Sequence, residues 1–362
     1  MGEQSGRSQV TSRLRWSLMR LFQIFIVICL VDGFLDIVFP LARFTKIYLT
    51  HKVSENWPSG SAEPGTLQNF VWPPSGLPTR DSAGMRGIVA EYHAPGINVA
   101  ADGLRSNGQS RSENARSVGL LLGSSAALGY GVADNQTLAA YLERALKNVR
   151  LDNYAAPGQV TAENTLRWYD LQKKNGKPDF VIIAGASYQL LTDCLQAPAE
   201  NANVNIFLVL ASWVADKYSP KRPTRCTSSE GIDLAVRSSI LAIENAVAFG
   251  RKQGIPFHIV YLPTPYDANA NVDNLLLTAE QKDNIAVMQR VLSHYHEELA
   301  KLDLPEFVDL SNALPSDKPY FLDIGGHLSA EGNRLVAEML FQRIWGQANS
   351  EKARKGQGNA IQ

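Results

Sequence analysis

The chain has few of the features that mark metal centres, nucleic-acid-binding domains or repeat proteins. Its 362 residues include only three cysteines and no CxxC pair, so a structural zinc site is not expected. Lys plus Arg and Asp plus Glu each total 35, whereas nucleic-acid-binding domains usually carry a basic excess. A Walker-type loop and a solenoid repeat are also missing from the sequence. We therefore expect no nucleic-acid partner, no metal and no cofactor.

The cysteines leave one question open. Cys194 and Cys226 could form a single disulfide if the domain is exported, because disulfides persist in oxidising compartments. Two unrelated buried thiols are the alternative, and the sequence does not decide between them.

Histidines are also scarce, which narrows the choice of a catalytic base. His294 and His296 are two residues apart on a predicted helix, so they do not share a face; a solvated helix surface is expected for both. His258 alternates within a predicted strand and is expected to be a core or sheet-face residue. His327 differs from these, because it lies in the Gly-rich stretch "YFLDIGGHLSAEGNR", with Asp323 four residues upstream.

A long apolar run is present only near the N-terminus. Leu21–Leu41 has the 21 residues needed to cross a bilayer, although Asp32 and Asp36 interrupt its second half. Four arginines precede it, which predicts a cytoplasmic N-terminus and an extracytoplasmic main domain, periplasmic if the source is bacterial. A cleaved signal peptide and a buried helix are the alternatives. An uncleaved anchor is favoured because no clear small-x-small cleavage site follows.

Composition divides the chain into five parts. The segment after the anchor is rich in Pro, Gly, Ser and Asn, and it is expected to pack on the main domain or to link it to the membrane. The predicted parts are a cytoplasmic stub at 1–17, a transmembrane anchor at 18–41, this membrane-proximal segment at 42–114, the main domain at 115–347 and a flexible tail at 348–362.

Within the main domain, apolar runs alternate with amphipathic stretches. This alternation predicts an α/β fold with a parallel sheet covered on both faces. Strands are expected at 118–123, within 148–158, and at 178–185, 256–263 and 306–311; helices are expected at 135–147 with Asp134 as N-cap, and at 161–176, 229–255, 278–303 and 329–346. The stretch 205–218 is ambiguous between strand and helix, and its length favours a helix. Ligands of such sheets bind at the carboxyl ends of the strands, where Ser124 and Ser125 follow the first run.

Four blocks of the sequence, spread over residues 95–345, resemble those of the SGNH/GDSL hydrolase family. "GSSAALGYGV" is similar to the first block, Gly-Asp-Ser-x-x-x-Gly, and its glycines place the family serine at Ser125. "NYAAPG" resembles the second block, with its glycine at Gly158. "GASY" occupies the position of the third block, Gly-x-Asn-Asp, and "DIGGH" that of the last, Asp-x-x-His. Upstream, "INVAADGLRS" is similar to a Gly-Phe-Arg stretch that often precedes the first block.

The resemblance implies a fold and a set of roles. The fold is a three-layer α/β/α, flavodoxin-like parallel sheet of about five strands. Ser125 is then the nucleophile, His327 its base and Asp323 the acid that orients the base. The backbone N–H groups of Ser125 and Gly158, with a side chain at Ser187, would form the oxyanion hole.

Three positions depart from the family pattern. Ser124 stands where the first block has Asp, and Ser187 stands where the third block has Asn. One extra residue separates Asp323 from His327. We expect Gly325 and Gly326 to absorb it in a bulge, because glycine adopts positive φ without steric cost.

Two functions follow from the resemblance. The first is a serine esterase or O-acyltransferase that acts on acyl esters, in particular acetyl esters, of extracytoplasmic carbohydrate or cell-envelope polymer. The second is a catalytically degenerate protein of the same fold that binds a glycan or a partner in a surface-polysaccharide assembly complex. The departures favour the second, and so do Asp32 and Asp36, which could face a membrane partner protein.

Overall fold

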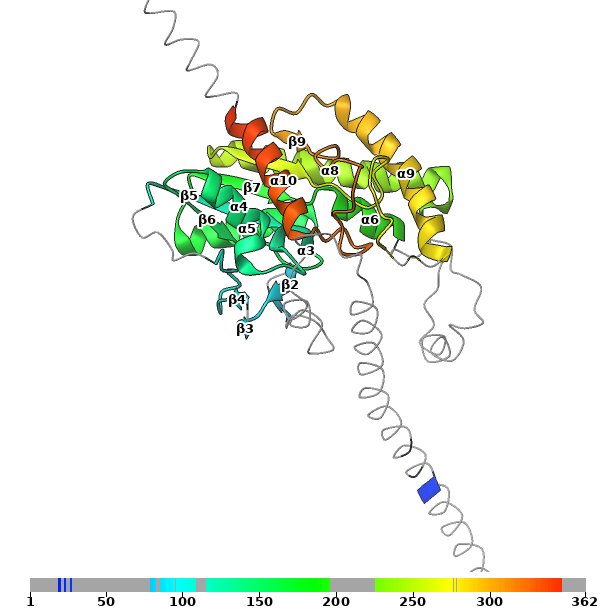
Figure 1. The fold of residues 1–362 in the computed structure, drawn as a ribbon, viewed down its shortest axis with the longest axis horizontal. Coiled ribbons are helices and arrows are strands. Elements are labelled where there is room, and N and C mark those ends of the chain that lie inside the picture. Colours follow the sequence, from blue (N-terminus) through cyan, green and yellow to red (C-terminus); the bar gives the residue numbers. More distant parts are fainter. Residues whose placement is uncertain are drawn as a thin grey trace, which may run out of the picture. The chain divides into compact units, whose positions relative to one another are not determined.

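The computed structural model describes residues 19, 20, 23, 27, 79–82, 85–94, 96–108, 115–195, 225–275, 277 and 279–346 (Figure 1). The chain divides into two compact units, Met1–Glu55 with Val71–Gly76, and Asn56–Phe70 with Leu77–Gln362. Nearly all of the predicted anchor at 18–41, the stub at 1–17, the tail beyond 346 and the ambiguous stretch 205–218 lie outside the described residues. No helix in the described ranges combines the length and apolarity needed to span a bilayer.

A five-stranded parallel sheet forms the centre of the second unit. Its spatial order is β6-β5-β7-β8-β9, and every neighbouring pair is parallel. This order is the flavodoxin-like arrangement of a doubly wound sheet. The predicted α/β class and parallel sheet are therefore confirmed. The strands are β5 (Ser117–Gly123), β6 (Val149–Asn153), β7 (Phe180–Ala184), β8 (Phe257–Tyr261) and β9 (Phe307–Asp309).

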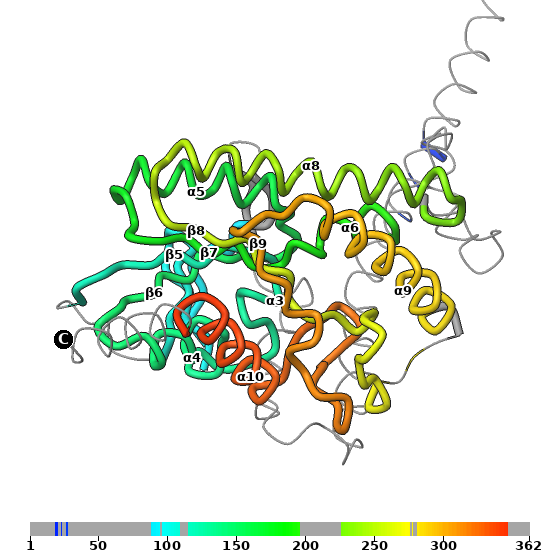
Figure 2. Tube along the Cα trace, turned by 90° about the horizontal axis from the view of Figure 1, so that it is seen from above, coloured from blue at the N-terminus to red at the C-terminus, as the bar shows by residue number. Residues whose placement is uncertain are grey.

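Helices cover both faces of the sheet, which gives three layers. Figure 2 shows α5 (Thr161–Asn175) and α8 (Ser229–Gln253) on one side, and α4 (Leu138–Ala145) and α10 (Ala330–Phe341) on the other. The strand residues alternate between two apolar clusters, as a period of two requires. Leu122 packs in the cluster beneath α5 and α8, and its neighbour Leu121 packs in the cluster beneath α4 and α10. The central strand β7 (FVIIA) is apolar throughout because both of its faces are buried.

The predicted helix after the first strand begins later than expected. Asp134 is not its N-cap; it opens a short 3-10 turn, η1 (Asp134–Gln136). Thr137 caps α4 instead, because its hydroxyl accepts a hydrogen bond from the Ala140 N–H at 3.1 Å. The carboxylate of Asp134 is bound by the buried Arg105.

Other helices lie close to their predicted ranges, and two were not predicted. α9 (Ala279–Ala300) packs against α8, and the chain continues past α10 into η3 (Gln342–Gly346). The unpredicted helices are α3 (Ser125–Leu128) and α6 (Ser187–Leu195), each of which begins directly after the end of a central strand.

The segment before the first sheet strand is more regular than its composition suggests. It contains two antiparallel pairs, β1 (Thr79–Ser82) with β2 (Met85–Val89), and β3 (Tyr92–Ala94) with β4 (Ile97–Val99). Arg105 then forms single β-bridges to Val99 and to Asn153 at the end of β6. This part of the chain therefore packs along the edge strand of the sheet.

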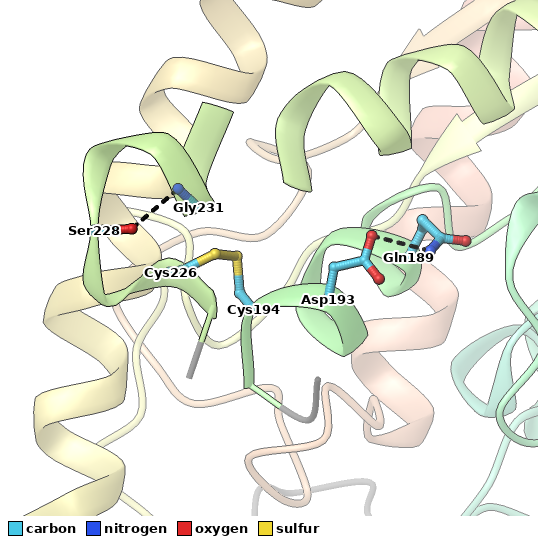
Figure 3. The surroundings of a disulfide bond; sticks show 6 residues. All are labelled: Gln189, Asp193, Cys194, Cys226, Ser228 and Gly231. Carbon is cyan, nitrogen blue, oxygen red and sulfur yellow. Dashed lines mark hydrogen bonds between the residues drawn. A yellow bond between two sulfur atoms is a disulfide. The ribbon is translucent and has the colours of Figure 1, made fainter. Parts of the chain in front are cut away.

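Cys194 and Cys226 form a disulfide (Figure 3). The bond joins the end of α6 to η2 (Arg225–Thr227), the turn that leads into α8. Both cysteines are buried in the apolar cluster beneath α8.

Candidate active site at the carboxyl ends of the strands

The first candidate residue lies in a tight corner after β5. A Cβ atom at Gly123 would lie 1.9 Å from the carbonyl oxygen of Ala184, so the ends of β5 and β7 approach too closely for any larger residue. The Ser124 N–H donates to that same carbonyl at 3.2 Å. The chain then turns into α3, and Ser125 is its first residue. Gly129 ends this helix with φ of 82°, a left-handed conformation that favours glycine.

The structure brings Ser125, His327 and Asp323 together. The imidazole Nε2 of His327 lies 2.8 Å from the Ser125 Oγ, and Nδ1 lies 2.6 Å from the Asp323 Oδ2. A carboxylate can only accept, so Nδ1 carries the proton that is donated to Asp323. Nε2 is then free to accept the proton of the Ser125 hydroxyl. This is the relay of nucleophile, base and orienting acid that acyl-transfer enzymes use.

A glycine bulge accommodates the extra residue between acid and base. Gly326 has φ of 83°, as expected for the position that absorbs an insertion. Asp323 Oδ1 accepts hydrogen bonds from the Gly325 N–H at 2.9 Å and from the His327 N–H at 3.4 Å. The loop is closed by the Leu322 N–H, which donates to the His327 carbonyl at 2.7 Å. The backbone of this one loop therefore fixes both the carboxylate and the imidazole.

The environment of Asp323 keeps its carboxyl ionised. Surrounding protein acts to raise its pKa, but nearly half of the side chain, 47%, remains exposed. The adjacent His327 and the hydrogen bonds from the ring and from two backbone N–H groups act in the opposite direction. The pKa of Asp323 is consequently held below its ordinary value, so the charge that stabilises an imidazolium is present at neutral pH.

One aromatic side chain packs on the imidazole and a second lies near its carboxylate partner, and sequence reasoning did not single them out. The ring of Tyr130 packs against the His327 ring with centroids 4.6 Å apart. Tyr266 is buried, and burial together with the charge of Asp323 raises its pKa to about 12. Pro265 packs beside Gly326, because a Cβ atom built on that glycine would lie 3.5 Å from the Cδ atom of Pro265. Tyr130 directly follows the last glycine of the first family-like block, which is the signal that could have found it.

Two backbone N–H groups are available where the sequence predicts an oxyanion hole. Within the described residues, the N–H of Ser125 and that of Gly158 donate to no protein acceptor. Gly158 has φ of 75°, and the only atom within 4 Å of a Cβ built there is the Tyr188 hydroxyl, at 4.0 Å. Ser187 begins α6 and is buried, but no contact joins it to Ser125 or Gly158 in the described structure. Its role as a donor stays a prediction.

The two histidines on α9, His294 and His296, were expected on a solvated helix surface, and the structure agrees only in part. His294 pairs with Asp233 at 3.1 Å, and His296 Nδ1 lies 3.1 Å from the Asp309 carboxylate. The His296 ring also packs against Tyr261 with centroids 4.8 Å apart. His296 is therefore half-buried rather than fully solvated, because it faces Tyr261 of β8 and Asp309 of β9. No described group of three or more His, Cys, Asp or Glu side chains is arranged for a metal ion.

Comparison with known proteins gives matches only among solved structures. No family model matches the sequence, and no curated protein matches it. A lipolytic protein of the G-D-S-L family from Desulfitobacterium hafniense is 17% identical, with 63% of this chain and 100% of that chain covered and a TM-score of 0.36. A psychrotrophic esterase from Pseudoalteromonas sp. is 13% identical over 64% and 99% of the two chains, with a TM-score of 0.35. An acetylxylan esterase from Geobacillus stearothermophilus is 17% identical over 64% and 95%, with a TM-score of 0.31.

Proposed function

We propose that the protein is a serine ester hydrolase or acyltransferase that works through a covalent acyl-enzyme. One observation carries the proposal: Ser125, His327 and Asp323 form an unbroken hydrogen-bond relay with distances of 2.8 and 2.6 Å. Serine hydroxyls are weak nucleophiles until a neighbouring base takes the proton. The base must in turn be held in the correct tautomer, as Asp323 holds His327 here. The proposal does not depend on the similarity to solved structures, since it follows from the side chains of this chain.

The reaction then proceeds in two halves. His327 Nε2 takes the hydroxyl proton of Ser125 while the Ser125 Oγ attacks the ester carbonyl. The N–H groups of Ser125 and Gly158 stabilise the resulting oxyanion. The hydroxyl of Ser187 is the proposed third donor. The C–O bond to the alcohol breaks, and His327 returns its proton to the departing alcohol oxygen. An acceptor hydroxyl then gives its proton to His327, attacks the acyl group and releases Ser125.

The acceptor decides between the two activities. Water as acceptor makes the protein an esterase, and a sugar hydroxyl makes it an O-acyltransferase. We propose acyl esters, in particular acetyl esters, of extracytoplasmic carbohydrate or cell-envelope polymer as the substrate class, as the family resemblance implies. The disulfide between Cys194 and Cys226 supports an extracytoplasmic domain, because such bonds persist in oxidising compartments. The apolar N-terminal segment is the proposed membrane anchor of the same domain.

Covalent labelling tests the proposal directly. Purified protein is treated with a fluorophosphonate probe and, separately, assayed with an aryl acetate ester. We expect labelling and turnover in the wild type and in Ser124→Ala, and loss of both in Ser125→Ala. Ser124 is the matched control, because it is the adjacent serine and is almost fully buried. If the wild type shows no more labelling or turnover than Ser125→Ala, the protein is not a serine hydrolase, and the glycan- or partner-binding alternative takes its place.

A further inference from the structure

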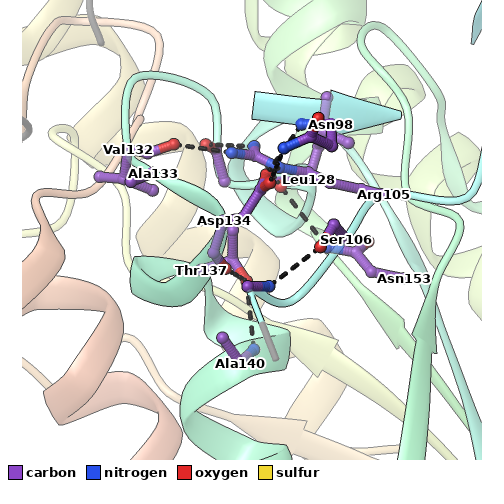
Figure 4. Close-up of polar contacts among 12 residues, drawn as sticks. Asn98, Arg105, Ser106, Leu128, Val132, Ala133, Asp134, Thr137, Ala140 and Asn153 are labelled. Atoms are coloured by element: carbon purple, nitrogen blue, oxygen red, sulfur yellow. Dashed lines mark hydrogen bonds and ion pairs between the residues drawn. The ribbon is translucent and has the colours of Figure 1, made fainter. Parts of the chain in front are cut away.

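Arg105 is the only arginine among the described residues whose side chain bonds the turn that follows Ser125. It lies in the segment that precedes the sheet, and it is 1% exposed. Its backbone is fixed at the edge of the sheet, because its N–H donates to the Asn153 carbonyl at 2.9 Å. From this position the side chain points toward Leu128 and Val132, as Figure 4 shows.

The guanidinium binds three carbonyl oxygens at the end of that helix. Nη1 donates to the carbonyls of Leu128 at 2.8 Å and Gly129 at 2.7 Å, and Nη2 donates to that of Val132 at 2.6 Å. These carbonyls belong to a helix terminus and a turn, where no intrahelical donor is available to them. A cation at the C-terminal end of a helix also interacts favourably with the backbone dipoles.

α3 needs such an anchor because it is very short. It has four residues, fewer than an isolated helix requires to be stable in water. Ser125 is its first residue and Leu128 its last. A displacement of its carboxyl end would therefore have only one helical turn over which to be absorbed before it reached Ser125.

The same turn also contacts the base. Tyr130 follows Gly129, and its N–H donates to the Ser125 carbonyl at 3.0 Å. The ring of Tyr130 packs on the ring of His327 at 4.6 Å between centroids. The turn held by Arg105 thus touches both partners of the hydrogen bond between Ser125 and His327.

The charge of Arg105 is balanced by the carboxylate of Asp134. Nε donates to Asp134 Oδ1 at 3.2 Å, and Asp134 is itself buried. Asn98 holds the same carboxylate through its backbone N–H at 3.2 Å and its side-chain amide at 2.9 Å. The fork geometry of a guanidinium serves four acceptors here, which a lysine ammonium cannot do with its three donors at a single point.

We propose that Arg105 is a positioning residue for catalysis, which sets the Ser125 hydroxyl against His327 through the carbonyls of the turn 128–132. The proposal rests on the serine hydrolase function proposed above. It assigns Arg105 no contact with substrate.

The experiment compares Arg105→Lys with Arg167→Lys. Arg167 is a matched control, because it is also buried and also donates to a backbone carbonyl, that of Asp102, but it lies on α5. Both variants are made in the full chain, and kcat, KM and the thermal unfolding midpoint are measured with an aryl acetate. We expect Arg105→Lys to lower kcat by on the order of 10², the effect of a small misplacement of reacting groups, with KM nearly unchanged. Arg167→Lys should keep kcat within a factor of about 3 of the wild type, the margin we set for an unperturbed site (an RT ln 3 difference of ~0.7 kcal/mol).

A second variant covers the case in which Arg105→Lys does not fold. Removing one partner of a buried ion pair is strongly destabilising, whereas removing both charges together is better tolerated. The double variant Arg105→Gln with Asp134→Asn should therefore fold and still show the low kcat. Wild-type kcat in any folded Arg105 variant, or an equal loss in Arg167→Lys, overturns the positioning role. An inactive and unlabelled wild type would instead overturn the proposed function itself.

Discussion

The hydroxyl of Ser125 and the imidazole of His327 form a hydrogen bond of 2.8 Å across 202 residues of sequence. Ser125 follows the first strand of the sheet, and His327 lies in the loop before the last long helix. The parallel sheet brings the two together, because its strands all end at the same edge. Substitutions within this site are expected to change kcat, and those in the surrounding core are expected to change the free energy of unfolding.

The first prediction concerns Asp323. Asp323→Asn removes the charge that faces His327 Nδ1, and an amide permits the opposite imidazole tautomer. We expect kcat with an aryl acetate to fall by about 10²–10⁴ with little change in KM, as for the orienting acid of other serine enzymes. Asp317→Asn, at an exposed position in the same connection, is the control and should retain wild-type kcat. Equal rates in the two variants would show that backbone contacts alone orient the imidazole.

The second prediction compares two neighbouring hydroxyls at the oxyanion hole. Ser187 holds the family-like position, whereas the Tyr188 hydroxyl lies near Gly158. Loss of an oxyanion donor costs about 10²–10³ in kcat, so we expect Ser187→Ala to show a loss near the lower end of this range. Tyr188→Phe is measured beside it, since it removes only one oxygen atom. A loss confined to Tyr188→Phe would transfer the donor role from Ser187 to Tyr188.

The third prediction concerns the pH dependence of stability. Asp267 is buried, and it accepts hydrogen bonds from the Tyr261 hydroxyl at 2.8 Å and the Thr264 N–H at 2.7 Å. Burial raises its pKa from 3.8 to about 6 despite these hydrogen bonds. Between these two values the folded protein retains a proton that the unfolded chain has released. The stability that Asp267 contributes is therefore present below pH 4 and is lost as the pH rises through 6.

Asp267→Asn isolates this contribution, because the amide stays neutral at every pH. We expect the free energy of unfolding of the wild type to fall relative to that of the variant by about 2 kcal/mol between pH 4 and pH 7. Urea unfolding at several pH values measures the difference. Asp273→Asn, at an exposed aspartate, should follow the wild type throughout. A constant difference between wild type and Asp267→Asn would show that the pKa of Asp267 is not raised in the folded state.

The fourth prediction concerns the disulfide. Cys194 and Cys226 are 32 residues apart, and a crosslink over such a loop typically stabilises a fold by about 2–4 kcal/mol. Replacing both cysteines by serine should lower the free energy of unfolding by this amount. The mass of the intact wild-type protein should also rise by about 2 Da on reduction, one hydrogen for each sulfur. No mass change on reduction would mean that the bond does not form.

Several parts of the fold could be predicted because they depend on local sequence. The apolar runs of β5, β7 and β8 indicated buried strands, and the long amphipathic stretches indicated α5, α8 and α9. α3 and α6 were missed because four and nine residues beside glycines give no clear helical period. Asp134 was misread as an N-cap because its partner, Arg105, lies 29 residues away in sequence.

In the candidate site, too, features set by neighbouring residues could be predicted, whereas those set by distant residues could not. Asp323 and His327 could be paired from the sequence because they share one loop, and Gly326 indicated how an extra residue would fit. The family-like spacing fixed the position of Ser187 along the chain but not its direction. Successive residues on a helix point about 100° apart. The Tyr188 hydroxyl lies near Gly158, and whether Ser187 also serves as a donor is what the second prediction tests. The partial burial of His296 depends on how α9 packs, which no local pattern reveals.

The arrangement of the site also affects when its chemistry can begin. A ribosome releases the corner that carries Ser125 long before it releases the loop that carries His327. During synthesis the nascent chain therefore holds an unactivated alcohol, and the capacity to attack an ester arises only when the C-terminal loop and helix have folded onto the finished sheet.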